Sequence, residues 1–335
     1  MSKNNLELMK VSSLSAKEIE KVDSFILDQN TNGEFINTIS FLDYHHEKWF
    51  KDDSIIIRDS GSKNIKGVMV ACVLPDAKDK IISHAGTTFS GPIINYTDSF
   101  EMTSKCIEMM FDYYEEKYKT IELRIPPVFF GAQPFGIIDF MLLNRGFQYR
   151  MKGLSNIIDL SHVNNEEDVF SMFNGKRRNQ VKKVCRSEKF IFQENDEISA
   201  DVWEQMNNNL NRKFGVSATH SIEDIRDLKS RFPNNIKAYY VNTNNGEYGA
   251  FCLAFKFKNV FHTQYLDTNY EYTGQYPNLY LIKELILLSI NEGYNYFSFG
   301  ASTENNGEYM NEGLYSYKAG YGGGSILLPM YVKQI

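Results

Sequence analysis

Apolar and polar positions follow the same order of elements twice along the 335-residue chain. Segments with helical spacing are followed by strands with two-residue alternation, and then by a helix, a strand, a short helix and a last strand. The loops are short, and no low-complexity linker separates the two rounds. The pattern therefore predicts two α+β domains, residues 1–161 and 162–335.

In the first round, helices are expected at 15–29, 35–50, 98–117 and 135–147, and strands at 54–59, 66–76, 80–94, 120–127 and 154–161. In the second, helices are expected at 165–173, 200–214, 221–232, 279–293 and 311–318, and strands at 236–243, 248–257, 259–269, 294–302 and 325–332. Gly146 has the position of a left-handed helix cap.

Composition narrows the class of protein. Hydrophobic residues make up 42% of the chain and charged residues 23%, which is typical of a soluble globular protein. We expect a cytoplasmic protein because its cysteines fit buried thiols in a reducing compartment. We expect no membrane-spanning segment, no signal peptide and no metal site. The scattered cysteines fit reduced thiols (Cys72, Cys106, Cys185 and Cys252). A net charge of −6 argues against a general nucleic-acid coat.

Positive charge is concentrated between Lys176 and Lys189, where seven basic residues face one acid, Glu188. Most such runs are solvated helix faces. An excess of this size in an acidic chain also fits binding of phosphate, because arginine and lysine side chains hold phosphate oxygens well. The candidate phosphate-binding residues are Arg177, Arg178, Lys182, Lys183 and Arg186.

The stretch "NEGLYSYKAGYGGG" places one lysine, Lys318, in a short helix before a glycine cluster. A preorganised ammonium can stabilise the oxyanion formed when an amine attacks an ester carbonyl. The alternative is a solvated lysine that interacts favourably with the helix C-terminus. Gly320 and Gly322–Gly324 permit a close backbone approach, or cap the helix before the last strand.

Two strands supply candidate substrate contacts. In "FHTQYLDTN", alternation places His262, Gln264 and Leu266 on one face and Thr263, Tyr265 and Asp267 on the other. The candidates there are Gln264, Tyr265 and Asp267, although an amphipathic strand needs no ligand to show this pattern. The strand end "FSFGAST" and the turn after it add Ser298, Ser302, Thr303, Asn311 and Gly320. His84 and Gly86 are weaker candidates, and Glu304 is not assigned as a base.

Several phrases resemble the Fem-type transferases: "FSFGASTENNGEYMNEGLYSYKAGYGG", "FNGKRRNQVKKVCRSEKFIFQEND", "SHAGTTFSGPII" and "ELRIPPVFF" followed by "LLNRGFQYRMKGLSNIIDLS". The likeness covers nearly the whole chain in the same order. It implies two tandem acetyltransferase-like (GNAT) domains, each a mixed, mainly antiparallel sheet flanked by helices. It also implies transfer of an acyl or aminoacyl group to an amine, with Lys318 in contact with substrate.

The donor is left open. Acetyl-CoA enzymes of this superfamily use a glycine-rich loop at a helix start, where backbone N–H groups hold the pyrophosphate. The corresponding stretches here, "YTGQYPNLYLIKE" and "TFSGPIINYTDS", depart from that pattern. Aminoacyl-tRNA, acetyl-CoA and acyl-carrier protein all stay possible donors, and no tightly bound cofactor is expected.

These inferences predict an enzyme that forms an amide on an amine-bearing, phosphate-linked acceptor, either an amino sugar or a cell-envelope or polysaccharide precursor. A tRNA acceptor stem is a further partner considered for the basic segment. The alternatives are an acetyl-CoA-dependent N-acetyltransferase with a non-standard donor loop, and a non-catalytic module that binds precursor or RNA. The oligomeric state does not follow from the sequence.

Overall fold

The computed structural model describes residues 5–45 and 49–335, and the chain divides into two compact units. Unit 1 comprises residues up to Gly153 together with Leu327–Ile335, and unit 2 comprises Leu154–Ile326. This division differs from the predicted boundary after residue 161. The reason is strand pairing, because residues from Ser155 onward pair within unit 2 while the end of the chain pairs within unit 1.

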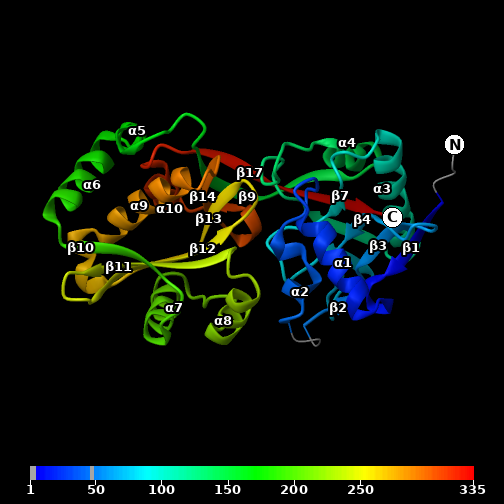
Figure 1. The fold of residues 1–335 in the computed structure, drawn as a ribbon, viewed down its shortest axis with the longest axis horizontal. Coiled ribbons are helices and arrows are strands. Elements are labelled where there is room, and N and C mark those ends of the chain that lie inside the picture. Colours follow the sequence, from blue (N-terminus) through cyan, green and yellow to red (C-terminus); the bar gives the residue numbers. More distant parts are fainter. Residues whose placement is uncertain (1–4, 46–48) are drawn as a thin grey trace. The chain divides into compact units, whose positions relative to one another are not determined.

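Unit 1 contains two groups of paired strands and four helices among the described residues (Figure 1). Its helices are α1 (Ala16–Leu27), α2 (Ile39–Leu42), α3 (Phe100–Glu115) and α4 (Ile137–Asn144). Its strands are β1 (Leu6–Lys10), β2 (Lys51–Asp52), β3 (Ile55–Asp59), β4 (Ile65–Met69), β5 (Ala71–Val73), β6 (Lys80–Ser83), β7 (Pro92–Ile94) and β8 (Thr120–Arg124). The pairing order is β1-β3-β4-β7 in one group and β8-β6-β5-β2 in the other.

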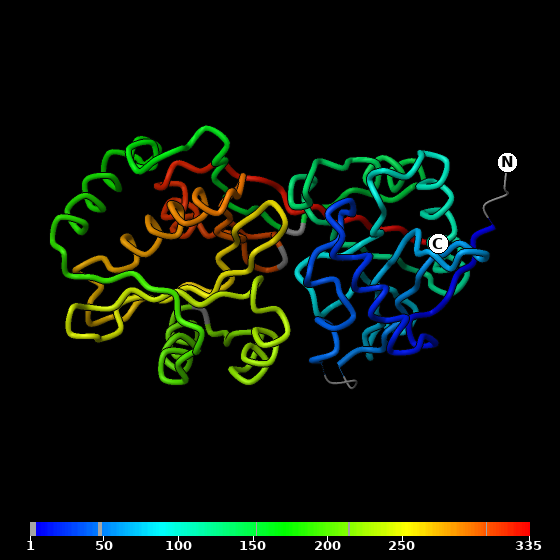
Figure 2. Tube along the Cα trace, in the orientation of Figure 1, coloured from blue at the N-terminus to red at the C-terminus, as the bar shows by residue number. Residues whose placement is uncertain are grey.

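The last strand, β17 (Gly324–Gln334), completes unit 1. It pairs antiparallel with β8 from Met330↔Arg124 to Gln334↔Thr120, and in Figure 2 the red end of the chain lies among the blue and cyan segments of this unit. The core under α3 and α4 is apolar and includes Tyr331 of β17. A domain boundary read along the sequence could not assign this strand to the first unit.

Unit 2 is a mixed sheet with helices on both faces. Its strands are β9 (Gln148–Asp159, which enters from unit 1), β10 (Phe190–Asn195), β11 (Ile236–Thr243), β12 (Tyr248–Lys256), β13 (Val260–Thr268) and β14 (Tyr296–Ala301). Its helices are α5 (Glu166–Met172), α6 (Gly175–Ser187), α7 (Ala200–Phe214), α8 (Ile222–Arg231), α9 (Pro277–Asn291) and α10 (Glu312–Ala319). Figure 1 shows α5, α6, α9 and α10 on one side of these strands and α7 and α8 on the other.

The sheet of unit 2 has the order β10-β11-β12-β13-β14-β9, with β13 and β14 parallel and the other neighbours antiparallel. Two more short strands, β15 (Thr303–Glu304) and β16 (Tyr309–Met310), pair with each other before α10. The predicted fold class is confirmed: each unit is α+β, with a mainly antiparallel mixed sheet flanked by helices.

Most predicted elements are present, with some differences. Strands β1 and β10 were not expected, and the helix expected at 35–50 is reduced to α2 with a turn of 3₁₀ helix before it. The chain turns there because Thr38 Oγ1 accepts the N–H of Phe41 and the Asp23 carboxylate accepts the N–H groups of Ile39 and Ser40. Part of this predicted helix, 46–48, lies outside the described residues.

Candidate active site

Lys318 is on the last turn of α10, and its side chain is buried. Asn311 caps the start of this helix by accepting the N–H of Leu314. The ammonium of Lys318 donates to two backbone carbonyl oxygens at the end of β14, that of Gly300 at 3.0 Å and that of Ala301 at 2.6 Å. An ammonium has three N–H donors, so one is left for another acceptor.

Lys318 differs from the other lysines that are buried in the described part of the chain. Lys229, Lys256 and Lys283 each form an ion pair with at least one carboxylate. Among the described residues, the partners of Lys318 are the two carbonyl groups, and burial lowers its pKa to about 7. Burying a charge without a counter-charge is costly, so Lys318 is a candidate for a role other than stability.

The two carbonyl groups converge because the end of β14 is irregular. The register of β14 against β9 shifts between Ser298 and Gly300, and Gly300 has a φ of +72°. That left-handed conformation suits glycine, and a side chain there would press on the His262 ring. Ser302 then fixes the turn: its N–H donates to the Leu154 carbonyl, and its hydroxyl donates to Asn156 Oδ1 at 2.6 Å.

Strands β13 and β14 separate close to this point. Their parallel pairing runs from Val260↔Tyr296 to His262↔Ser298, and β13 then continues to Thr268. Burial lowers the pKa of His262 to about 4, with a further lowering by the positive charge of Lys318. A neutral imidazole and a buried ammonium therefore lie together where the two strands separate.

The predicted alternation along β13 is wrong beyond Thr263. The register against β12 passes from Ala254↔Thr263 to Leu253↔Tyr265, so Gln264 is the extra residue of a β-bulge. After the bulge, Tyr265 and Asp267 lie on the same face as His262. Such a bulge depends on the partner strand, which a single-strand pattern does not reveal.

Two of the β13 candidates take part in internal hydrogen bonds on the side of α7. Asp267 is buried and accepts from Asn209 Nδ2 at 2.9 Å and from the Tyr248 hydroxyl at 2.8 Å. The Tyr265 hydroxyl lies 2.8 Å from His220 Nδ1. These contacts give both residues a structural role. Gln264 is nearer the candidate site, since its side chain interacts with His262.

The candidates at the end of β14 and in the following turn form hydrogen bonds with other residues of unit 2. Ser298 is buried, and its hydroxyl lies 3.0 Å from His262 Nδ1. Thr303 Oγ1 accepts the N–H of Leu154, and Asn311 Nδ2 donates to Glu304 Oε1 at 2.6 Å. Ser302 is also buried.

Asn156 was missed by the sequence analysis. It is buried on β9, and its Nδ2 has no hydrogen-bond partner among the described residues. A single amide within the apolar strand "LSNIIDL" was the available signal, because a buried polar side chain needs partners. The sequence places His262 on a strand but does not indicate it as a site residue, because its proximity to Lys318 exists only in the folded chain.

The basic segment forms α6, and its residues divide into two groups. Arg178 donates to the carbonyl oxygens of Phe170, Ser171 and Phe173, where α5 ends. Arg177 donates to the Tyr317 carbonyl at 3.1 Å and stacks on the rings of Tyr317 and Tyr321.

Because of these contacts, the two arginines stabilise unit 2, and their part in phosphate binding stays a prediction. The other three candidates, Lys182, Lys183 and Arg186, are exposed and line a surface hollow of about 420 Å³. Among the predicted phosphate-binding residues, these three are placed to reach an external anion.

The start of α9 does not fit a coenzyme A pyrophosphate held in the usual way. Its first residue, Pro277, has no N–H, and Tyr276 before it has a φ of +61°. The Asn278 side chain donates to the Tyr317 hydroxyl at 2.9 Å. In unit 1, the other candidate stretch contains strand β7, and a side chain at Gly91 would overlap Ile125.

The chain is similar to several known proteins. Residues 175–318 match the family model described as an acetyltransferase (GNAT) domain. A search among curated proteins gives no match. The crystal structure of FemX superposes with a TM-score of 0.68 at 12% identity, covering 98% of this chain and 97% of that one.

Two further solved structures are similar along nearly their whole length. The C-terminal domain of a putative lysylphosphatidylglycerol synthetase from Agrobacterium fabrum has a TM-score of 0.58 at 10% identity, covering 95% of this chain and 91% of that one. A tandem GNAT protein from the clavulanic acid biosynthesis pathway has a TM-score of 0.54 at 8% identity, covering 98% of each chain. The protein has a GNAT-type fold. At these identities the likeness establishes the fold alone.

Residues 5–45 and 49–335 contain no group of three or more His, Cys, Asp or Glu side chains arranged to hold a metal ion. Over the same residues, none of the helices has the length and apolar character needed to span a bilayer.

Proposed function

We propose that the protein is an acyl or aminoacyl transferase that forms an amide on an amine-bearing, phosphate-linked acceptor. The observation that carries this proposal is the burial of Lys318 without a carboxylate partner in the part of the chain that the structure describes, at the point where β13 and β14 separate. The acceptor we favour is an amino sugar or a cell-envelope precursor. The GNAT-type fold, shared with FemX and a lysylphosphatidylglycerol synthetase, supports transfer chemistry.

In the proposed reaction, the acceptor amine attacks the carbonyl carbon of an ester or thioester donor. A C–N bond forms, the carbonyl oxygen becomes an oxyanion, and the C–O or C–S bond then breaks. The amine gives up one proton, which leaves with the alcohol or thiol. Lys318 would stabilise the oxyanion with its remaining N–H, an interaction worth about 3–4 kcal/mol in comparable sites.

We assign no general base. Glu304, the first carboxylate after β14, accepts a hydrogen bond from Asn311 and is exposed. His262 is neutral at pH 7 and would be available as an acceptor, but its Nδ1 lies against the Ser298 hydroxyl. The phosphate of the acceptor would bind the exposed cations of α6, namely Lys182, Lys183 and Arg186.

A second candidate is an N-acetyltransferase that uses acetyl-CoA, because the family model matched by 175–318 is that of an acetyltransferase domain. Pro277 at the start of α9 argues against it. Offering acetyl-CoA, aminoacyl-tRNA and acyl-carrier protein separately to the purified protein, with amino sugars and nucleotide-linked amino sugars as acceptors, distinguishes these donors.

The decisive variant is Lys318→Met, with Lys256→Met as its matched control. Lys256 is equally buried in unit 2 but has an ion pair with Glu292 at 2.7 Å. We expect Lys318→Met to lower kcat about 100- to 1000-fold while acceptor binding is retained. Lys256→Met should lower thermal stability and leave kcat within a few-fold. Unchanged turnover in Lys318→Met, or an equal loss in both variants, would contradict the proposed role of Lys318.

A further inference from the structure

Unit 1 contains a hollow of about 570 Å³, which we call the unit-1 hollow. The lining is mixed: polar residues form about half of it, and the apolar wall consists of Val11, Leu14, Ile19, Ile39, Leu42 and Phe50. Asp52 and His84 supply polar atoms to the same hollow. A volume in this range, with an apolar wall and a few convergent polar groups, is typical of small-molecule sites.

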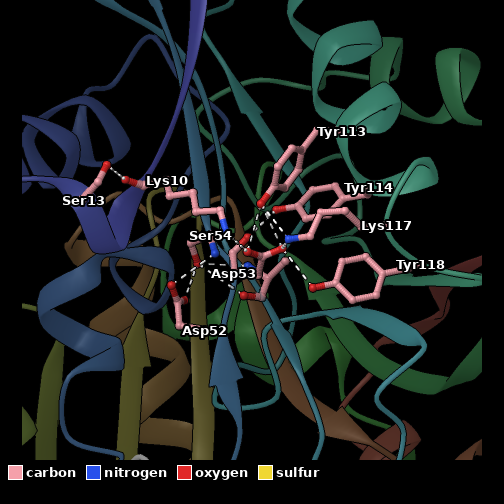
Figure 3. Close-up of polar contacts among 10 residues, drawn as sticks. Lys10, Ser13, Asp52, Asp53, Ser54, Tyr113, Tyr114, Lys117 and Tyr118 are labelled. Carbon is pink, nitrogen blue, oxygen red and sulfur yellow. Dashed lines mark hydrogen bonds and ion pairs between the residues drawn. The ribbon is translucent and has the colours of Figure 1, made fainter.

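The carboxylate of Asp52 is held in a fixed position. Oδ1 accepts from the Ser54 hydroxyl at 2.6 Å, and Oδ2 accepts from the Ser54 N–H at 3.1 Å. The next residue, Asp53, is buried and tied to the end of α3 through the Tyr113 hydroxyl and Lys117 (Figure 3). Successive side chains on a strand point to opposite sides, so this anchoring directs Asp52 away from α3.

His84 has one ring nitrogen without a hydrogen bond among the described residues. The side chain is buried, and Nδ1 accepts the N–H of Gly86 at 3.2 Å. In a neutral imidazole the proton is then on Nε2. Burial, with smaller effects of His45 and Arg124, lowers the pKa of His84 to about 3, so the ring is neutral at pH 7. Nε2 therefore presents a donor.

That donor lies 3.8 Å from Oδ1 of Asp52, which is too far for a direct hydrogen bond. One atom between the two groups must accept a hydrogen bond from His84 and donate one to Asp52. A hydroxyl group, of a ligand or of water, does both. An ammonium cannot accept, and a phosphate, although its protonated oxygen can donate, would be repelled by Asp52 and Asp43.

We propose that the unit-1 hollow binds a neutral, hydroxylated ligand with an apolar face, of the chemical class of a pyranose sugar. One hydroxyl would bridge Asp52 Oδ1 and His84 Nε2, and the C–H face of the ring would lie on the apolar wall. The sugar of an amino-sugar acceptor would belong to this class. That assignment as acceptor rests on the proposed function, whereas the binding itself does not.

The test is calorimetric titration of the full chain with N-acetylglucosamine, methyl glucoside and inorganic phosphate. We expect both sugars to bind and phosphate not to bind at this site. Asp52→Asn and His84→Leu should weaken sugar binding about 10- to 100-fold, because the first replaces a charged acceptor of the bridging hydroxyl by a weaker neutral one and the second removes its donor. His84→Gln, which keeps an N–H donor, should restore part of the affinity. Lys78→Gln, at an exposed position of the same unit outside this lining, should leave it unchanged.

Some outcomes would overturn this inference. They are failure of folded wild-type protein to bind either sugar at millimolar concentration, equal binding by wild type and Asp52→Asn, or preference for phosphate. Thermal unfolding of each variant shows whether it is folded. Sugar binding should persist in Lys318→Met. Sugar binding without transfer from any donor would contradict the proposed function alone, and transfer without sugar binding in the hollow would contradict this inference alone.

Discussion

The buried ammonium of Lys318 lies close enough to the imidazole of His262 to lower the pKa of that ring. Burial is the larger cause and brings the His262 pKa to about 4. Burial also lowers the Lys318 pKa to about 7, so the lysine changes charge near neutral pH while the histidine stays neutral. The charge state of this pair at pH 7 therefore depends on Lys318.

The first prediction concerns stability and pH. The Lys318 pKa is about 7 in the folded protein, whereas the ordinary pKa of a lysine is 10.5. Between pH 7 and pH 10.5 the unfolded chain therefore binds more protons than the folded chain does. The free energy of unfolding should therefore rise with pH across this window, by at most about 1.4 kcal/mol per pH unit from this group. Below pH 7 the full cost of burying the charge is present.

Urea unfolding of wild type and Lys318→Met at pH 6, 7, 8 and 9 measures this effect. The difference between the two proteins should change with pH in the stated direction. A pH-independent difference between wild type and Lys318→Met would contradict the lowered pKa.

The sequence predicted the fold class well because local patterns determine most elements. The predicted cap at Gly146 is confirmed, with a φ of +87°. Long-range pairing was not accessible: the bulge at Gln264 arises from its register with β12, and β17 joins unit 1 through β8. The sequence could suggest that Lys318 is exceptional, but not that it lacks a carboxylate, since that depends on which residues surround it after folding.

The second prediction separates the two groups of basic residues on α6. Replacing Lys182, Lys183 and Arg186 together by Gln should weaken binding of pyrophosphate about tenfold at low salt, with little change in stability, because these side chains are exposed. Arg178→Gln should instead lower the unfolding free energy, because three carbonyl groups at the end of α5 lose their donor.

Calorimetry with pyrophosphate and thermal unfolding measure the two effects. Added salt should reduce the difference between wild type and the triple variant, since exposed charges are screened. Equal affinity of both proteins for pyrophosphate would remove the α6 cations from the proposed phosphate site.

The third prediction concerns the glycine cluster after α10. Gly322 has a φ of +90°, and a Cβ there would overlap the carbonyl group of Met172. Backbone strain alone costs about 1–3 kcal/mol at such a φ, and the overlap adds to this cost. Gly322→Ala should therefore lower the unfolding free energy by more than the strain alone. Gly324→Ala is the control, because a Cβ there meets no atom within 4 Å. Similar unfolding midpoints for the two variants would show that the cluster is not constrained in this way.

The fourth prediction concerns Asp53, the carboxylate that anchors β2 to α3 in unit 1. Burial alone would raise its pKa, but hydrogen bonds from Lys117, Tyr118 and Tyr113 outweigh that effect and lower it. A lowered pKa in the folded state means that the stabilisation is present above the ordinary pKa of 3.8 and is lost as the pH falls through the folded value. Asp53→Asn should lower the unfolding free energy by about 1–3 kcal/mol at pH 7.

Denaturant unfolding between pH 7 and pH 2.5 checks this prediction. Because the variant has no carboxylate at position 53, its stability should fall less steeply than that of wild type in the acidic part of the range, so the two curves approach each other. Asp76→Asn, at an exposed position of the same unit, should follow wild type throughout. Parallel curves for wild type and Asp53→Asn would mean that the hydrogen bonds in Figure 3 do not lower the Asp53 pKa, and that β2 is held in place mainly by its pairing with β5.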